Sequence, residues 1–384
     1  MPEPRHDTNL GITGVDHFEY VASDLAAARE LLVGRMGFAE TGRASAEAAA
    51  ASGEDAVLLA VGHVQVVVVA PREGWSRAAR WLRRHPEGVA VMAYRVRDAA
   101  AARATLAGRA ATFVDETQVG ASGAQKWFDI ATPLGDVRFR FIEHPVGTLP
   151  PGLEPLPEGE AANPFGFQVV DHVTSNMLTL EPHVTWLRDV MGFEEYWRVT
   201  FHTSDVHGGS GGSGLASIVM WDRESGVKLA NNEPYPPNFE ASQIYAFVDA
   251  NHGPGIQHIA LHVPDIVTAV EGLRARGVDF LPTPGSYYDM LPARLADRRV
   301  TNFRDDIGEL RRLGILVDGE DDRYLLQIFT VEAQALLGRE AGGPFFWEVI
   351  RRRGARGFGE GNFRALFEAI EREQQRRVGE GGAA

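Results

Sequence analysis

The segment GVDHFEY, residues 14–20, decides the fold because it recurs in the middle of the chain as VVDHVTS, residues 169–175. The shared letters VDH stand at 15–17 and again at 170–172, an interval of 155 residues. The same interval carries MGF at 36–38 onto MGF at 191–193, and a helix-like run precedes MGF in each copy. Two matches in one register indicate an internal repeat.

A second repeat lies inside this pattern. GVAVMAYRVRDAAAARATL at 88–106 matches GIQHIALHVPDIVTAVEGL at 255–273, so that Val96 and Asp98 align with Val263 and Asp265. Each of the four units has a β-type segment, then a helix-like run, then β-rich sequence such as KWFDIATPLGDVRFRFIEH at 126–144. The chain is therefore predicted to be an α+β protein of two domains, each built from a pair of strand–helix–strands modules.

The domain boundary is marked by proline. The stretch HPVGTLPPGLEPLPEGEAANPFG at 144–166 contains six prolines, which helices and central strands do not accept. We expect an N-terminal domain at 1–150, a proline-rich linker at 151–165 and a C-terminal domain at 166–384. The run HGGSGGSG at 207–214 lacks the lysine of a phosphate-binding loop, so it is expected to be a flexible hairpin connection without chemistry.

The composition narrows the classes of function. The 384 residues are 44% hydrophobic and carry a formal charge of -14, which supports large cores and disfavours nucleic acid or an anionic membrane as a partner. The absence of cysteine excludes thiolate metal sites and cysteine nucleophiles, so any metal must be held by His, Asp, Glu or backbone oxygen. Because the start lacks a secretory signal and no apolar run reaches about 18 residues, a cytoplasmic small-molecule enzyme is expected.

The repeat singles out two of the twelve histidines. His172 and His258 stand at equivalent positions on the first strands of the third and fourth modules, and pairing of these modules would bring the two strands together. A third ligand is expected from a late strand, and PFFWEVI at 344–350 places Phe346 and Glu348 on one face. A carboxylate on such an apolar face needs a partner. Two histidines and one carboxylate leave coordination positions open, as in non-haem iron(II) oxygenases.

The N-terminal half provides an internal control for this hypothesis. A single histidine after aspartate at a strand start is more often a hydrogen-bonded structural residue than a metal ligand. His17 matches His172, but the position that matches the second histidine is Val91. The N-terminal domain is therefore expected to be metal-free, with His17 structural. His183 and His262 lack a symmetric partner and are expected to be packing or surface residues.

Longer segments carry a resemblance to a known family. GPGIQHIALHVPDI (253–266), FLPTPGSYYDML (280–291), LRRLGILVDGEDDRYLLQIFT (310–330) and FFWEVIRRRGARGFGEGNFRALFEAIE (345–371) resemble the 4-hydroxyphenylpyruvate dioxygenase family of the vicinal oxygen chelate superfamily. The resemblance implies open, barrel-like mixed sheets and iron(II) bound at His172, His258 and Glu348 of a catalytic C-terminal domain. It also implies the substrates 4-hydroxyphenylpyruvate and dioxygen, the product homogentisate, a role in tyrosine catabolism and, by analogy alone, a homo-oligomer.

The same resemblance assigns the substrate pocket. The family's polar positions are matched by Ser217, Asn232, Gln257 and Gln327, and its aromatic and lid positions by Phe329, Phe346, Phe358, Asn362 and Phe363. Strand alternation supports part of this assignment, because it places Gln327 and Phe329 on one face. It conflicts at Gln257, which alternation puts opposite His258, and a bulge or a frayed strand start would be needed to remove the conflict.

The C-terminal segment NFRALFEAIEREQQRR at 362–377 is predicted to be an amphipathic helix. Its apolar stripe by itself indicates only that the helix docks on the protein body. Three glycines precede Asn362, the expected N-cap, and would let the helix move, so we predict a lid over the iron site. Truncation after Arg353 is expected to abolish turnover and to leave iron bound.

Two departures from the family pattern, Ala230 and Ala216, lie near the proposed ring-binding wall and leave the metal ligands intact. Because of these two departures, the sequence is also compatible with other functions. The nearest is that of 4-hydroxymandelate synthase, which has the same ligands and substrate but hydroxylates the benzylic carbon. A different vicinal oxygen chelate enzyme, or a non-catalytic ligand-binding protein of the same fold, are further alternatives, and the complete triad disfavours the latter.

Overall fold

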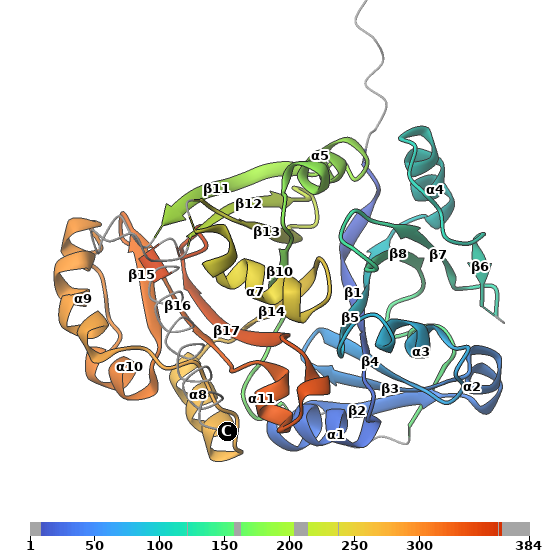
Figure 1. The fold of residues 1–384 in the computed structure, drawn as a ribbon, viewed down its shortest axis with the longest axis horizontal. Helices are drawn as coiled ribbons and strands as arrows, with labels where there is room; N and C mark the ends of the chain where they lie inside the picture. Colours follow the sequence, from blue (N-terminus) through green and yellow to red (C-terminus); the bar gives the residue numbers. More distant parts are fainter. Residues whose placement is uncertain are drawn as a thin grey trace, which may run out of the picture.

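Two large mixed sheets organise the protein in a computed structural model that describes residues 9–120, 122–156, 163–202, 214–236, 238–359 and 361–362. One sheet is formed by the N-terminal half of the chain and one by the C-terminal half, and both are curled (Figure 1). The lid helix predicted beyond Asn362 and the glycine–serine run at 207–213 lie outside the described residues. Within those residues, no helix has the length and the apolar character needed to cross a membrane.

The N-terminal sheet has nine strands in the order β6-β7-β8-β5-β1-β4-β3-β2-β9. Central β1 is antiparallel to β5 on one side and parallel to β4 on the other. The strands are β1 Ile12–Val21, β2 Ala39–Ala44, β3 Glu54–Val61, β4 Val64–Pro71, β5 Gly88–Val96, β6 Gln118–Val119, β7 Lys126–Ala131, β8 Arg138–Glu143 and β9 Leu153–Pro155. The proline-rich stretch thus contributes β9, which extends this sheet beside β2.

The C-terminal sheet follows the same plan with eight strands in the order β11-β12-β13-β10-β14-β17-β16-β15. Central β10 and β14 are antiparallel, and β13 and β17 run parallel beside them. The strands are β10 Val170–Asn176, β11 Glu194–His202, β12 Gly214–Trp221, β13 Lys228–Pro234, β14 Gly255–His262, β15 Leu316–Glu320, β16 Arg323–Phe329 and β17 Phe346–Arg353. Apart from β9, this order is that of the N-terminal sheet in reverse, which confirms the predicted α+β fold of paired modules.

Helices fill the connections between the strands. They are α1 Leu25–Arg29, the π-helix η1 Glu30–Arg35, α2 Ala46–Ser52, α3 Arg77–Leu82, α4 Ala99–Gly108, α5 Glu181–Asp189, the 3-10 helix η2 Phe239–Ala241, α7 Gln243–Ala250, α8 Ile266–Ala275, α9 Gly285–Asp297, α10 Ile307–Leu313, α11 Ala333–Leu337 and the 3-10 helix η3 Glu340–Gly342. The longest connection, from β14 to β15, carries α8, α9 and α10 along one side of the molecule (Figure 1).

The residues that repeat in the sequence begin and end helices. Asp98 and Asp265, aligned by the second repeat, cap α4 and α8, and their carboxylates accept hydrogen bonds from the backbone N–H groups of residues 101 and 268 at 2.9 and 3.3 Å. Gly37 and Gly192 have φ angles of +74° and +75°, a left-handed conformation that follows a helix end and favours glycine. The sequence similarity of the halves therefore reflects shared local structure.

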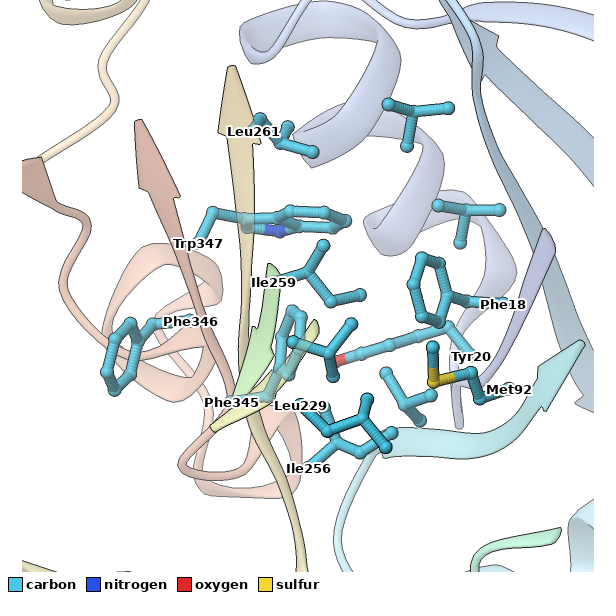
Figure 2. Packing of buried hydrophobic residues seen from close by; sticks show 14 of the residues in the cluster. Phe18, Tyr20, Met92, Leu229, Ile256, Ile259, Leu261, Phe345, Phe346 and Trp347 are labelled. Atoms are coloured by element: carbon cyan, nitrogen blue, oxygen red, sulfur yellow. The ribbon is translucent and has the colours of Figure 1, made fainter. Parts of the chain in front are cut away.

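The two sheets share one apolar core, which lies between them. Alternation along each central strand sends one set of side chains to this core and the other set to the concave side of its own sheet. Figure 2 shows Phe18 and Tyr20 of β1 facing Ile259 of β14, with Trp347 of β17 close by. Phe346, the neighbour of Trp347 in sequence, points the other way (Figure 2). Polar side chains of the central strands can therefore collect on the concave sides.

Candidate metal centre

Three buried side chains converge at the centre of the C-terminal sheet: His172 on β10, His258 on β14 and Glu348 on β17. The Nε2 atoms of His172 and His258 lie 3.2 and 3.3 Å from Oε2 of Glu348. One ligand atom from each residue falls within 4.8 Å of the others, and the residues are 5%, 6% and 1% exposed. The structure thus brings together the triad that the repeat and strand alternation predict.

Asp171 and Arg352 orient His172. Nδ1 of His172 lies 2.8 Å from Oδ1 of Asp171, and Arg352 donates two hydrogen bonds to the same carboxylate, at 2.6 and 2.7 Å. Burial alone would raise the pKa of Asp171, but the hydrogen bonds from Arg352 and His172 hold that pKa well below its usual value. The ionised carboxylate can only accept, so Nδ1 of His172 carries a hydrogen and Nε2 presents its lone pair toward Glu348.

A β-bulge sets the orientation of His258. In the pairing of β10 with β14, Thr174 is opposite His258 and Ser175 is opposite Ile256, so Gln257 is an extra residue in β14. The bulge resolves the conflict between alternation and the resemblance, because Gln257 and His258 both line one cavity. Oε1 of Gln257 lies 3.1 Å from Nδ1 of His258 and accepts its hydrogen, which leaves Nε2 as the free nitrogen.

The donor atoms of the triad fit a divalent cation. Two imidazole lone pairs face a carboxylate, and Oε1 of Glu348 is buried with no hydrogen-bond partner in the part of the chain that the structure describes. Burial lowers the pKa of His258, whereas at His172 the Glu348 charge and the hydrogen bonds with Asp171 and Glu348 together outweigh burial and raise the pKa. A cation would give every one of these atoms a partner. Two nitrogens and one carboxylate, with no thiolate, match the ligand set of non-haem iron(II) enzymes.

A narrow cavity of about 30 Å³ adjoins the triad. Besides the triad, its walls are formed by Thr174, Leu215, Ala230, Asn232, Gln243, Ile244, Gln257, Gln327, Phe329 and Phe358. Asn232 is held by a hydrogen bond from its Nδ2 to Oδ1 of Asn176, at 3.1 Å. The Oδ1 atom of Asn232 is buried and has no partner among the described residues. The wall of the cavity therefore includes a residue with a fixed, unpaired hydrogen-bond acceptor.

The predicted pocket residues do not all reach this cavity. Those that line it are Asn232, Gln257, Gln327, Phe329 and Phe358. Ser217 is buried opposite Asn232 on the adjacent strand and is not part of the wall. Phe346 is also outside the wall and stacks on the ring of His258, with 4.8 Å between the ring centroids. Phe346 thus fixes a ligand from behind.

Asn362 does not contact the cavity, and it is not the predicted N-cap, because Gly361 before it already has helical geometry. The side-chain oxygen of Asn362 accepts a hydrogen bond from the Tyr287 hydroxyl at 2.7 Å. The carboxylate of Asp318 accepts one from the Gly361 N–H at 3.1 Å. A carboxylate from a distant strand thus takes the place of a local cap. Phe363 lies outside the described residues.

Sequence reasoning missed four residues of the cavity wall: Thr174, Leu215, Gln243 and Ile244. Strand alternation could have found Thr174, which lies two positions after His172 and shares its face. Gln243 and Ile244 begin α7, which packs on β13 and β10. The local signal was Ser242, whose hydroxyl caps this helix by accepting a hydrogen bond from the Ile244 N–H at 3.2 Å. That signal predicts a helix but not its packing.

The N-terminal sheet holds an ion cluster where the C-terminal sheet holds the triad. The register of β5 with β8 matches that of β14 with β17 and places Arg140 where the C-terminal domain has Glu348. Arg140 donates two hydrogen bonds to Asp129, at 2.7 and 3.0 Å, and pairs with Glu19. Burial would raise the pKa of Glu19, but the charges of Arg140 and Arg77 and the hydrogen bond from Arg140 together outweigh burial, and the pKa falls to about 2. A guanidinium therefore neutralises the buried carboxylates, and Val91 stands in place of the second histidine.

The other histidines considered above have structural contacts. Nδ1 of His17 lies 2.7 Å from Oδ1 of buried Asp16. His183 is buried in α5 and stacks on Trp186. Nδ1 of His262, a partly exposed residue, lies 3.0 Å from a side-chain amide oxygen. These contacts agree with packing and surface roles.

Comparisons with known proteins agree with this geometry. The sequence matches the Glyoxalase/Bleomycin resistance protein/Dioxygenase superfamily over residues 16–128 and 171–290, once in each half. A 4-hydroxyphenylpyruvate dioxygenase from Dictyostelium discoideum is 32% identical over 383 residues, which cover 95% of this chain and 99% of that protein. Another, from Caenorhabditis briggsae, is 36% identical over 303 residues, which cover 76% of this chain and 74% of that protein.

A solved structure has the same architecture. A triple mutant of 4-hydroxymandelate synthase from Streptomyces coelicolor superposes with a TM-score of 0.79 at 28% sequence identity, covering 95% of this chain and 99% of that chain. The resemblance seen in the C-terminal segments therefore extends through both halves of the molecule.

Proposed function

The chain belongs to the 4-hydroxyphenylpyruvate dioxygenase family of the glyoxalase/bleomycin resistance protein/dioxygenase superfamily, and from this we propose that it oxidises 4-hydroxyphenylpyruvate with iron(II). The reaction consumes one dioxygen and yields homogentisate and carbon dioxide, a step of tyrosine catabolism. The observation that carries the proposal is the buried triad of His172, His258 and Glu348, in which both Nδ1 atoms are engaged and both Nε2 atoms face the carboxylate.

The residues of the cavity bind and orient the substrate in this proposal. Iron(II) held by the triad supplies the site at which the 2-oxo acid is chelated and dioxygen is activated. The buried, unpaired Oδ1 of Asn232 can accept a hydrogen bond from the phenolic hydroxyl. Gln327 on β16 adds a second amide to the wall, and Phe329 and Phe358 exclude water and restrict the position of the ring.

Substrate binding requires part of the wall to move, because a cavity of about 30 Å³ holds little more than water. Phe358 is the best placed side chain: it packs on His172 with 5.0 Å between ring centroids and lies between Gly357 and Gly359. Gly359 has a φ of +80°, and a Cβ atom there would lie 2.6 Å from Nε2 of Gln327. The position thus requires glycine, whose freedom lets the segment move Phe358 aside.

Benzylic hydroxylation to 4-hydroxymandelate is the second candidate function, and the architecture shared with 4-hydroxymandelate synthase favours it. The position of the ring relative to the iron decides between the two products. In this chain the adjoining wall contains Ala230, which packs with Val219 and Phe358 in one small apolar cluster. The two sequence relatives described above are named as 4-hydroxyphenylpyruvate dioxygenases, and they support ring hydroxylation.

Product analysis tests the proposal. Metal-free protein is loaded with iron(II) without oxygen, then given 4-hydroxyphenylpyruvate and oxygen, and the products are separated by chromatography. Homogentisate supports the first function and 4-hydroxymandelate the second. Protein that has bound iron and consumes no oxygen with this substrate contradicts both. Homo-oligomeric assembly and a cytoplasmic location remain predictions, which sedimentation and cell fractionation test.

A further inference from the structure

A cavity of about 270 Å³ opens on the N-terminal domain beside α3, far from the metal ligands in the sequence. Its walls carry five guanidinium groups against one carboxylate, with the residues Arg77, Arg80, Trp81, Arg83, Arg84, Ala90, Asp136 and Arg138. This concentration of positive charge occurs in a chain whose formal net charge is -14. The charge of this cavity is therefore opposite in sign to the net charge of the chain.

The wall of this cavity shares two equivalent positions with the wall of the catalytic cavity. Helix α3 packs on β4 and β1, as α7 packs on the equivalent strands β13 and β10. Each helix is capped by a fully buried serine and begins at the next residue, Arg77 or Gln243. Ala90 lies at the bulge of β5, as Gln257 lies at the bulge of β14. Arg77 and Ala90 of this cavity thus stand at positions equivalent to Gln243 and Gln257 in the wall of the catalytic cavity.

The strand that carries Glu348 shows the same change. Val91 is opposite Arg138 in β5 and β8, as His258 is opposite Phe346 in β14 and β17. An aromatic side chain next to the metal site is therefore a guanidinium in the N-terminal pocket. Arg77 and Arg138 thus place cations where the C-terminal domain has Gln243 and Phe346, and cations suit an anion.

The positive charges of the pocket are neutralised only in part: Arg77 pairs with Glu19 and Glu54, and Arg84 pairs with Asp136, whereas Arg80 and Arg83 are held by backbone oxygens. Arg83 donates a hydrogen bond to the backbone oxygen of residue 74 at 2.9 Å, and Arg80 donates one to that of residue 75. In the described part of the chain, no carboxylate lies within 4.0 Å of either guanidinium. Arg138 reaches Asp129 only at 4.0 Å, and Asp129 is already bound by Arg140. Burial and the neighbouring Arg77 both lower the pKa of Arg138, as expected where cations gather.

From the lining and the position we infer that this pocket binds a small anion with at least two oxyanionic groups, either phosphoryl or carboxyl. Guanidinium forks match both groups through paired hydrogen bonds. The ligand is small because the cavity of about 270 Å³ is closed on one side by Trp81 and Ala90, which are 7% and 2% exposed. A flat basic surface would instead suit an acidic macromolecule.

Calorimetric titration of the full-length protein tests the inference, with inorganic pyrophosphate as the phosphoryl probe and citrate as the carboxyl probe. We expect saturable binding of one of the two probes at one site per chain, at fixed ionic strength. The double variant Arg80→Gln/Arg83→Gln should weaken binding roughly tenfold or more, because hydrogen bonds from charged groups are lost. Neither residue has a carboxylate partner among the described residues, so the fold should tolerate both changes.

Arg188→Gln/Arg223→Gln is the matched control, because it removes the same charge at two exposed arginines of the C-terminal domain, 57% and 71% exposed. The control should bind the probe with unchanged affinity. Absence of saturable binding of either probe overturns the inference, and so does equal weakening in the control, which would indicate attraction by overall charge alone. The result is independent of the proposed oxygenase function, since the probes need no iron.

Discussion

Replacing Arg352 with glutamine should weaken both the fold and the metal site. The guanidinium donates two hydrogen bonds to Asp171, at 2.6 and 2.7 Å, and two to the backbone oxygens of residues 355 and 357, at 3.2 and 2.6 Å. Its central carbon also lies 5.3 Å from the centroid of the Phe358 ring. Arg352 therefore connects the carboxylate behind His172 to the glycine-flanked segment that carries Phe358.

The magnitude follows from the burial of the ion pair. The side chains of Arg352 and Asp171 are 15% and 7% exposed. Removing one partner of a buried pair destabilises a protein by about 3–5 kcal/mol, because the other charge is left without compensation. We expect about 3 kcal/mol, because Asp171 keeps its hydrogen bond with His172. Loss of a partner that orients a ligand lowers metal affinity roughly 10–100-fold, and the same decrease is expected here for iron(II).

Urea unfolding measures the stability of Arg352→Gln, and equilibrium dialysis against iron(II), without oxygen or substrate, measures its affinity. Arg351→Gln is the matched control. Arg351 is the preceding residue of β17 and points to the opposite face. Its guanidinium lies 3.7 Å from Asp305, too far for a hydrogen bond, so its removal should cost less than that of Arg352 and should leave the metal site intact. Wild-type iron affinity in Arg352→Gln, or an equal decrease in the control, would refute the reasoning that Arg352 orients His172 through Asp171.

Four further substitutions test other parts of the structure. Glu348→Ala should lower iron(II) affinity by more than the roughly 100-fold expected for loss of an outer partner, whereas His17→Ala should leave iron content per folded chain unchanged; metal analysis distinguishes the two. Asn232→Ala should lower kcat/KM by roughly 5- to 30-fold, equivalent to about 1–2 kcal/mol, and an unchanged value would mean that Asn232 does not bind the substrate. Burial lowers the pKa of His183 to about 4, so the stability that its neutral ring contributes is present above about pH 6.5 and is lost as pH falls toward 4. His183→Phe should therefore flatten the decrease in unfolding free energy between pH 6.5 and 4 by about 3 kcal/mol in urea titrations, and parallel curves for the two proteins would contradict this.

Local and symmetric features of this protein are predictable from its sequence. The helix caps Asp98 and Asp265 act on backbone groups three residues away, so a short stretch of sequence is enough to predict them. His172 and His258 are predictable because a duplicated fold places equivalent residues about one axis. Glu348 follows from alternation with Phe346 on a single strand.

Features that depend on packing between distant segments are not predictable in this way. Arg352 and Asp171 are 181 residues apart, and no sequence pattern around either residue indicates that they pair. Asp318 likewise accepts the hydrogen bond of the Gly361 N–H from a distant strand, and no neighbouring residue indicates this contact. The sequence therefore predicts Asn362 as the N-cap, which is wrong. The bulge at Gln257 is predictable only in part. Strand alternation indicates an irregularity near Gln257 and His258, but only the strand pairing shows that it is a bulge at Gln257.

Arg140 occupies the position that Glu348 holds in the other domain, and the two domains of this duplicated fold therefore neutralise their buried carboxylates in different ways. Each sheet gathers buried carboxylates on its concave side and must neutralise them. The N-terminal sheet does so with the guanidinium of Arg140, which is part of the chain and cannot exchange, and which binds Asp129 and Glu19. The C-terminal donors suit an exchangeable ion instead, and such an ion can keep coordination positions for other molecules. Converting the first arrangement into the second would take more than Val91→His and Arg140→Glu. The new glutamate would face Glu19 and Asp129, and the domain would then depend on a metal for its folding.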